Sequence, residues 1–255
     1  MDLQLTVIGL LVGFLVGLTG VGGAALLTPL LIMMGIQPTI AVGTDLVYNS
    51  ITKIFGTLQH WRQQTVNWPI VFWFAVGSVP SAVIAVNLIQ WVDTLFGNAD
   101  LFIQKVLGVA LILIPIAMLV KTMRDRRDPR PNRWQQLELK EKRKLTVAIG
   151  ATLGFIVGLT SIGSGSLFAL ALMYFFRLGG KEIVGTDIAH AFLLVTAAGF
   201  AHMGYGNVDY TVVWQLLFGS IPGVFVGSIL STRVPTIFLR FVISTIIMVT
   251  GLKLI

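Results

Sequence analysis

The chain has 255 residues, of which 55% are hydrophobic and 11% are charged, and its formal net charge is +7. The charged fraction is about half of that usual in soluble domains, so the composition excludes a water-soluble globule. Residues 121–144 hold ten Lys or Arg against four Asp or Glu, which is +6 of the net charge, so the basicity belongs to one loop and indicates no nucleic-acid partner.

Long apolar stretches follow one another along the chain. Each is long enough, or nearly so, for the roughly 20 residues with which a helix crosses hydrocarbon. The short alternating strands of a membrane β-barrel are not seen. The sequence therefore predicts an all-α, polytopic integral membrane protein, with apolar stretches at residues 3–35, 39–59, 68–91, 101–120, 145–177, 183–201, 208–230 and 235–255.

The two halves of the chain repeat one another. GFLVGLT at 13–19 recurs as GFIVGLT at 154–160, and VGTD at 42–45 recurs at 184–187. From Val42 onward the offset is a constant 142 residues. This self-similarity predicts a duplicated unit, with a first transmembrane repeat at 1–120 and a second at 145–255.

Residues 121–144 form the expected linker between the repeats. The segment contains Pro129 and Pro131 and few apolar residues, with a short helix expected near Trp134 to Lys144. Basic loops beside membrane helices are typical of the cytoplasmic side. We therefore place the linker in the cytoplasm.

Each repeat begins with an apolar stretch of more than 30 residues that glycines interrupt, GVGG at 20–23 and SIGSG at 161–165. One straight helix over residues 3–35 would extend about 50 Å, well beyond a hydrocarbon core of ~30 Å. If the stretch folds back as a hairpin, the repeats are inverted; if it is one broken span, they are parallel. Inversion is favoured because it places most loop cations on the cytoplasmic side. These cations are Arg62, Arg177, Lys181 and Arg233. The expected fold is two inverted repeats, each a glycine-broken hairpin plus three transmembrane helices.

The two glycine-rich breaks are the candidate substrate site. Interrupted helices in inverted repeats commonly hold the substrate of a secondary transporter near the membrane midplane. A tight turn that frees backbone N–H groups at a helix amino end suits an anion. The alternative is that these small residues only allow close helix packing. The substrate-binding candidates are Gly20, Gly22, Gly23, Gly163, Ser164, Gly165 and Ser166.

Polar residues inside the apolar spans are candidates for coupling or gating. An ionised Asp at mid-membrane costs about 2.5–3.5 kcal/mol on insertion scales, which favours a functional role. Asp45, Asn49 and Lys53 share one helical face, whereas Val195 matches Lys53 in the second repeat. The alternatives are helix N-caps for the aspartates and interfacial hydrogen bonds for the histidines. The full set is Asp45, Asn49, Lys53, His60, Asp187, His190 and His202.

No metal or cofactor site is expected from the sequence. The three histidines are scattered and form no local ligand cluster. The G-x-G patterns lack the strands of a dinucleotide fold. We assign neither a catalytic residue nor a cofactor.

An ordered set of motifs resembles the TauE/SafE family of sulfite exporters. The set comprises GIQPTIAVGTD at 35–45, VNW at 66–68, GFIVGLTSIGSGSL at 154–167, VGTDIAH at 184–190 and GSIPG at 219–223. The resemblance covers nearly the entire chain outside the linker. It implies a bacterial inner-membrane transporter of sulfite, organosulfonates or related sulfur oxyanions, coupled to protons. Many members of the family have GTS where this chain has GTD, so roles of that serine are not carried over.

The expected function is secondary transport of a small sulfur-containing oxyanion, as an exporter that uses the proton gradient. The expected partners are the inorganic or organic oxyanion, protons and the lipid bilayer, with no nucleic acid; a homo-oligomer is left open. Three alternatives remain: a transporter of another small anion, an intramembrane enzyme that uses Asp45 and Asp187 as acid and base, and a scaffold whose linker recruits a partner.

Overall fold

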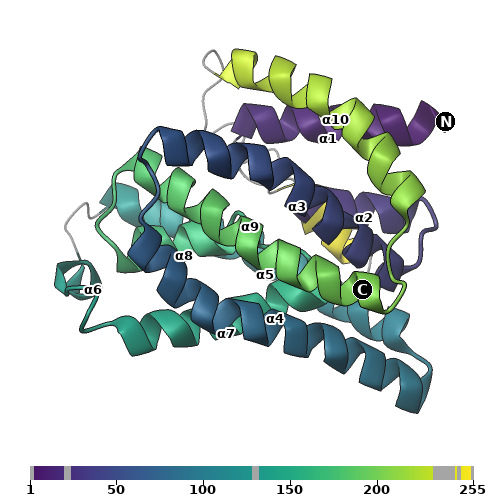
Figure 1. Ribbon diagram of the computed structural model, residues 1–255, viewed down its shortest axis with the longest axis horizontal. Helices are drawn as coiled ribbons and strands as arrows, with labels where there is room; N and C mark the ends of the chain where they lie inside the picture. Colours follow the sequence, from purple (N-terminus) through teal and green to yellow (C-terminus); the bar gives the residue numbers. More distant parts are fainter. Residues whose placement is uncertain (1–2, 20–23, 128–131, 232–244, 246–247, 254–255) are drawn as a thin grey trace.

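The computed structural model describes residues 3–19, 24–127, 132–231, 245 and 248–253, and this part of the chain is a helical bundle (Figure 1). No strand occurs in these residues. The helices that lie wholly within them are α1 (Leu3–Thr19), α2 (Ala24–Met33), α3 (Pro38–Arg62), α4 (Trp68–Phe96), α5 (Ala99–Arg127), α6 (Arg133–Gln136), α7 (Arg143–Thr160), α8 (Leu167–Phe175), α9 (Gly180–Gly204) and α10 (Tyr210–Ser231).

Several of these helices can cross a membrane. In the described residues, five segments are long and apolar enough: Trp68–Phe96, Ala99–Ala117, Arg143–Thr160, Gly180–Gly204 and Tyr210–Gly227. Helix α1 is apolar but shorter. Helix α3 has 25 residues, roughly 37 Å at 1.5 Å per residue, and carries buried polar side chains. The prediction of an all-α, polytopic membrane protein is confirmed.

The first helix of each repeat packs against the other repeat. A Cβ atom built on Gly13 of α1 would lie 2.7 Å from Cα of Ser220 in α10, and one on Gly154 of α7 would lie 2.5 Å from Cα of Ser78 in α4. The glycines match one another in the duplicated sequence, and so do the serines. Glycine is required at both positions because the two backbones are in contact. The repeats are thus interlocked by two equivalent seams, α1 with α10 and α4 with α7.

Helices α3 and α9 occupy equivalent places in the two repeats and run in opposite directions. Gly43, near the start of α3, contacts the backbone of Asn207, just beyond the end of α9. Gly185, near the start of α9, contacts the backbone of Thr65, just beyond the end of α3. The two helices cross side by side in the middle of the bundle (Figure 1). The start of each helix therefore lies beside the end of the other, so α3 and α9 are antiparallel.

The threonine of each GTD motif ties this crossing to the start of a helix in the other repeat, α10 for Thr44 and α4 for Thr186. Thr44 Oγ1 accepts a hydrogen bond of 3.0 Å from Asp209 N, and Thr186 Oγ1 accepts one of 3.0 Å from Asn67 N. Asn67 is the N-cap of α4, and Asp209 Oδ1 accepts from the first turn of α10. The motif therefore has a structural role besides its aspartate, because its threonine holds the residue that precedes a helix of the other repeat.

The expected break in the second repeat is present. Helix α7 ends at Thr160, Ser161 has φ 61° and Gly163 has φ 95°, and α8 begins at Leu167. Both residues lie in the left-handed region, which reverses the chain sharply and which glycine adopts without strain. In the first repeat, α1 and α2 flank the corresponding break, but Gly20, Gly22 and Gly23 lie outside the described residues.

The linker differs from its prediction in two ways. Helix α5 continues to Arg127, past the expected boundary at residue 120. The short helix expected near Trp134 to Lys144 is present but shorter: α6 covers only Arg133–Gln136, and α7 starts at Arg143. Asn132 and Gln135 form a capping box that starts α6, and Leu137 is extended and ends it. The capping box and the extended Leu137 thus confine this helix to a single turn.

The linker caps the carboxyl end of α8. Asn132 Nδ2 donates to Tyr174 O at 2.7 Å, and Gln135 Nε2 donates to Met173 O at 2.9 Å. Lys142 Nζ donates to Phe175 O at 2.7 Å. The last carbonyls of a helix lack intrahelical partners, and a cation is favourable there. The linker therefore stabilises the short helix that follows the second break.

Replacing Lys142 with methionine is expected to loosen α8. The hydrogen bonds to Phe175 and Trp134 are lost, and hydrogen bonds of a charged group contribute about 1.5–3 kcal/mol each. We expect faster amide hydrogen exchange in α8, measured by mass spectrometry in detergent. Lys140→Met is the matched control because Lys140 is exposed. Equal exchange in the two variants would refute the capping role.

Candidate functional site

Asp45 lies at the centre of a buried polar cluster on α3. Its Oδ2 accepts a 2.6 Å hydrogen bond from Thr28 Oγ1 of α2, and its Oδ1 accepts a 2.6 Å hydrogen bond from Asn49 Nδ2 one turn along α3. All three side chains are buried, Asp45 with no exposed surface. Both carboxylate oxygens are satisfied, as a charged group in an apolar interior requires. The expected shared face of Asp45 and Asn49 is confirmed.

Lys53 is the buried cation of the site. It is 8% exposed and lies on the same helix two turns beyond Asp45. It interacts electrostatically with both Asp45 and Asp187. No ion pair within 4 Å joins these residues in the described structure, so one ammonium serves two carboxylates at a distance. The cluster carries two acidic groups and one basic group, an unequal balance in a low-dielectric interior.

In α9, Asp187 is the counterpart of Asp45, and His190 lies one turn beyond it. The surroundings of Asp187 differ from those of Asp45. His190 Nε2 shares a 2.8 Å hydrogen bond with Ser78 Oγ of α4, and its ring packs against Phe168 and Phe74. Asp187 is 4% exposed, and its Oδ1 is buried without a hydrogen-bond partner. The sequence equivalence of the two aspartates therefore does not extend to their hydrogen bonding.

The duplicated sequence places chemically different residues at another matched contact. His190 lies against Ser78, and its counterpart Tyr48 interacts with Ser220, the counterpart of Ser78. Each contact joins the α3 and α9 crossing to a helix of one seam, α4 or α10. A shift of α4 or α10 would therefore move a side chain that contacts α9 or α3.

The second break reaches the Asp45 cluster. The buried hydroxyl of Ser161 interacts with the Asp45 carboxylate but completes no hydrogen bond. Ser164 is fully buried, and its hydroxyl has no partner. Ser166, the N-cap of α8, makes no side-chain cap bond. In the described part of the chain, the N–H groups of Gly163, Ser164 and Gly165 donate to no other backbone group. The break thus offers several free donors beside a carboxylate.

Two histidines of the candidate set lie away from this cluster. His60, at the end of α3, shares a 2.8 Å hydrogen bond between its Nδ1 and Thr65 Oγ1. His202, at the end of α9, is fully buried; its ring interacts with the backbone of Gly158, but neither ring nitrogen completes a hydrogen bond with a described residue. His60 thus makes a hydrogen bond of the kind that the interfacial alternative expects, and His202 does not.

The N-cap alternative for the two aspartates is wrong. Helix α3 begins at Pro38 and α9 at Gly180, so Asp45 and Asp187 each lie seven residues inside a helix. The sequence suggested caps because each GTD motif precedes an apolar run. Proline at the first turn of α3 and a capping box formed with Glu182 in α9 start the helices earlier.

Sequence reasoning missed five residues of the site. They are the hydroxyl residues that surround the candidate side chains: Thr28, Tyr48, Ser78, Ser161 and Ser220. Ser78 and Ser220 match one another in the duplication, which was a usable signal. Thr28 had none, because a lone threonine in an apolar helix is common.

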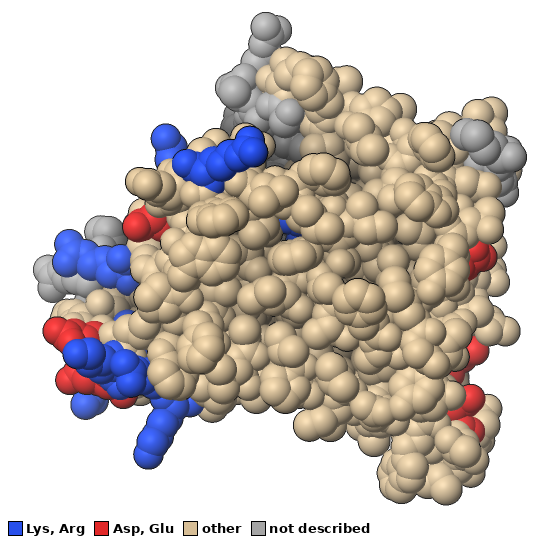
Figure 2. All heavy atoms as spheres, viewed as in Figure 1, with Lys and Arg blue, Asp and Glu red and all other residues tan. Residues whose placement is uncertain are grey.

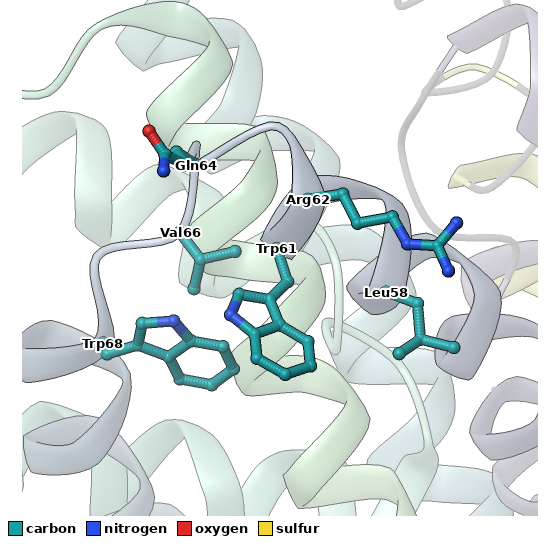
Figure 3. Close-up of a pocket in the computed structure, with 6 residues that line it drawn as sticks. All are labelled: Leu58, Trp61, Arg62, Gln64, Val66 and Trp68. Atoms are coloured by element: carbon teal, nitrogen blue, oxygen red, sulfur yellow. The ribbon is translucent and has the colours of Figure 1, made fainter.

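A hollow lies at the end of the bundle, away from the aspartates. It has a volume of about 590 Å³ and is lined by Leu58, Trp61, Arg62, Gln64, Val66 and Trp68 (Figure 3). The rings of Trp61 and Trp68 meet edge to face at 6.5 Å. Exposed tryptophan beside arginine is typical of a membrane–water interface. The hollow contains none of the candidate side chains, and we assign the substrate elsewhere.

Charge is unequal at the two ends of the helices. Lys and Arg atoms gather at the left end of the visible face, where α6 lies, whereas only Asp and Glu atoms colour the right end (Figures 1 and 2). Arg62 ends α3, and Lys181 and Arg143 lie at the starts of α9 and α7. Asp93 lies near the end of α4 and Asp209 immediately before α10, at the other end. In the described residues, no group of three or more His, Cys, Asp or Glu could hold a metal ion.

Five apolar crossing segments, buried carboxylates and a buried broken helix define a polytopic α-helical membrane protein with a polar centre. Its particular family follows from comparison with known proteins. The model of the family described as "Sulfite exporter TauE/SafE" matches residues 5–254. The chain belongs to this family.

Curated relatives carry similar descriptions. The chain is 55% identical over the full length of both proteins to "Probable membrane transporter protein YjnA" of Bacillus subtilis (strain 168). It is 26% identical to "Probable membrane transporter protein YunE" of the same organism, over 88% of this chain and 85% of that protein. It is 28% identical to a "Probable membrane transporter protein" of Xylella fastidiosa (strain 9a5c), over 87% and 81%. No solved structure matches the chain. The protein is a multi-pass membrane transporter, and its relatives are described as transporters rather than enzymes.

Proposed function

We propose that this protein is a proton-coupled secondary transporter that exports a small sulfur-containing oxyanion, such as sulfite or a sulfonate, across the bacterial inner membrane. The observation that carries the proposal is the buried break at residues 161–166. There, hydroxyl and N–H donors that have no partner among the described residues lie at the amino end of α8, close to a buried polar cluster. The description of the family supports a sulfur oxyanion as substrate.

Oxyanion chemistry fits the donors of the break. A sulfite or sulfonate group presents several oxygens in a compact head, and each accepts hydrogen bonds from N–H and O–H groups. Gly163, Ser164, Gly165 and Ser166 are the substrate-binding residues of the second repeat. A helix amino end adds positive potential. The matching residues Gly20, Gly22 and Gly23 complete the proposed site from the first repeat.

The proposed topology is an inverted pair of repeats. It is supported by the opposite directions of α3 and α9, because helices related by parallel repeats would point the same way. The basic end of the bundle supports a cytoplasmic linker, with the amino terminus outside. Transport then proceeds by movement of one interlocked seam relative to the other around the α3 and α9 crossing.

Coupling to protons is proposed to use the buried carboxylates and histidines of the crossing. Bringing an anion beside a carboxylate is costly unless a cation or a proton accompanies it. Lys53 supplies one cation for Asp45 and Asp187. Transport of an anion therefore requires a proton at this centre. Asn49, His60, His190 and His202 complete the proposed coupling and gating set.

The test is flux of radiolabelled sulfite in proteoliposomes, with and without an imposed pH gradient. We expect wild-type flux to rise with the gradient and to be inhibited by methanesulfonate more than by acetate. Ser164→Ala is expected to raise the half-saturating concentration about tenfold, the effect of losing one hydrogen bond to a charged group.

Gly163→Leu is expected to reduce flux further, because Gly163 has φ 95° and any side chain there is strained. Ser81→Ala is the matched control, since its hydroxyl bonds only to a carbonyl of its own helix. Unchanged flux in both break variants would refute the proposed site. Transport of acetate in preference to both sulfur anions would refute the proposed substrate class.

A further inference from the structure

The two aspartates of the duplicated GTD motif are equivalent by sequence and unequal in their hydrogen bonding. Both oxygens of Asp45 accept short hydrogen bonds, from Thr28 and from Asn49. Hydrogen bonds to a carboxylate stabilise its negative charge. Asp45 therefore has two contacts that favour its ionised form.

Asp187 has neither of those donors. Ala191 occupies the position one turn along α9 that Asn49 occupies on α3, and α8 has the sequence LFALALMYF, with no threonine or serine. Asp187 Oδ1 is buried without a partner, and no described residue donates a hydrogen bond to the carboxylate. An ionised carboxylate in such a place is strongly disfavoured unless a cation approaches it.

The charged groups around Asp187 come almost entirely from α3. Lys53 interacts with it, and His60 lies farther along α3, bonded to Thr65. On α9 itself, His190 points its Nε2 to Ser78 of α4. In their described parts, α4 bears only Asp93 near its far end, α8 bears no charge, and α7 bears only Arg143 and Lys144 at its start. Lys53 is therefore the cation that decides the charge of Asp187.

We propose that Asp187, and not Asp45, is the carboxylate that binds and releases the transported proton, with Lys53 as its positioning residue. This inference rests on the proposed function and assigns its coupling step. The proton arrives from water on one side, forms an O–H bond at a carboxylate oxygen of Asp187, and leaves to water on the other side. When the Lys53 ammonium turns toward Asp45, Asp187 is protonated; when it turns toward Asp187, the proton is released.

The first test compares the gradient dependence of sulfite flux in two matched variants. In Asp187→Asn, whatever flux remains is expected to be the same with and without the pH gradient. In Asp45→Asn, flux and melting temperature are expected to fall, while the ratio of flux with and without the gradient is kept. The proposal is overturned if Asp187→Asn keeps a gradient-dependent flux or if only Asp45→Asn loses it.

A second test needs no substrate and separates this inference from the proposed function. Infrared difference spectra of the purified protein between high and low pH are expected to show the C=O stretch of a buried carboxylic acid. The band is expected to vanish in Asp187→Asn, to move in Asp187→Glu and to stay in Asp45→Asn. A band that survives Asp187→Asn and vanishes in Asp45→Asn overturns the assignment. If wild-type protein moves no sulfite, the proposed substrate fails, and the spectra still decide which aspartate is protonated.

Discussion

Replacing Lys53 with methionine is expected to abolish gradient-driven transport and to destabilise the protein. Methionine has nearly the same length and no charge, so the change removes the ammonium and keeps the packing. The two buried aspartates then lose their shared cation. Removing one partner of a buried ion pair costs about 3–5 kcal/mol, and this is the upper limit here because Lys53 interacts with the aspartates at a distance. Thermal unfolding in detergent and sulfite flux in proteoliposomes measure the two effects.

A second substitution tests whether charge balance is the cause. Lys53→Met combined with Asp187→Asn is expected to recover most of the lost stability, because Asp45 keeps its bonds to Thr28 and Asn49. Transport is not expected to recover. Lys181→Met is the control for a lysine at the exposed start of α9. A single variant Lys53→Met as stable as wild type would contradict the role of Lys53 as a shared countercharge.

Placing alanine at Gly154 is expected to disrupt the seam between α7 and α4. The added Cβ would lie 2.5 Å from Cα and 2.7 Å from Cβ of Ser78, and the Ser78 backbone cannot move without moving α4. Overpacking costs about 1–3 kcal/mol where side chains can adjust, and contact with backbone places this change at the upper end. The yield of monodisperse protein and its melting temperature should both fall.

The matched position and a control make this prediction specific. Gly13→Ala is expected to have a similar effect, since its Cβ would meet Ser220 in the equivalent seam. Gly204→Ala should be neutral or stabilising, because nothing lies within 4 Å of a Cβ there and alanine favours helix over glycine. If all three variants melt alike, backbone contact is not what makes these glycines necessary.

Local patterns in the sequence were enough to predict the membrane helices, the duplication and the break in the second repeat. The length and polarity of the apolar stretches predict membrane helices, because burial in hydrocarbon depends on the composition of each segment alone. The constant offset of 142 residues indicated the duplication, and the SIGSG run indicated the break after α7. The contact between Asp45 and Asn49 was also predictable, since residues four apart share a helical face.

Tertiary structure alone decided which segments meet. No local pattern in the sequence shows that α1 packs on α10 and α4 on α7, because these contacts join residues far apart in the chain. The contacts that distinguish the two aspartates are of the same kind. Thr28 donates a hydrogen bond to Asp45 from another helix, whereas no described residue donates one to Asp187 Oδ1. The sequence shows two copies of one motif; only packing between helices gives one carboxylate its donors and leaves the other without them.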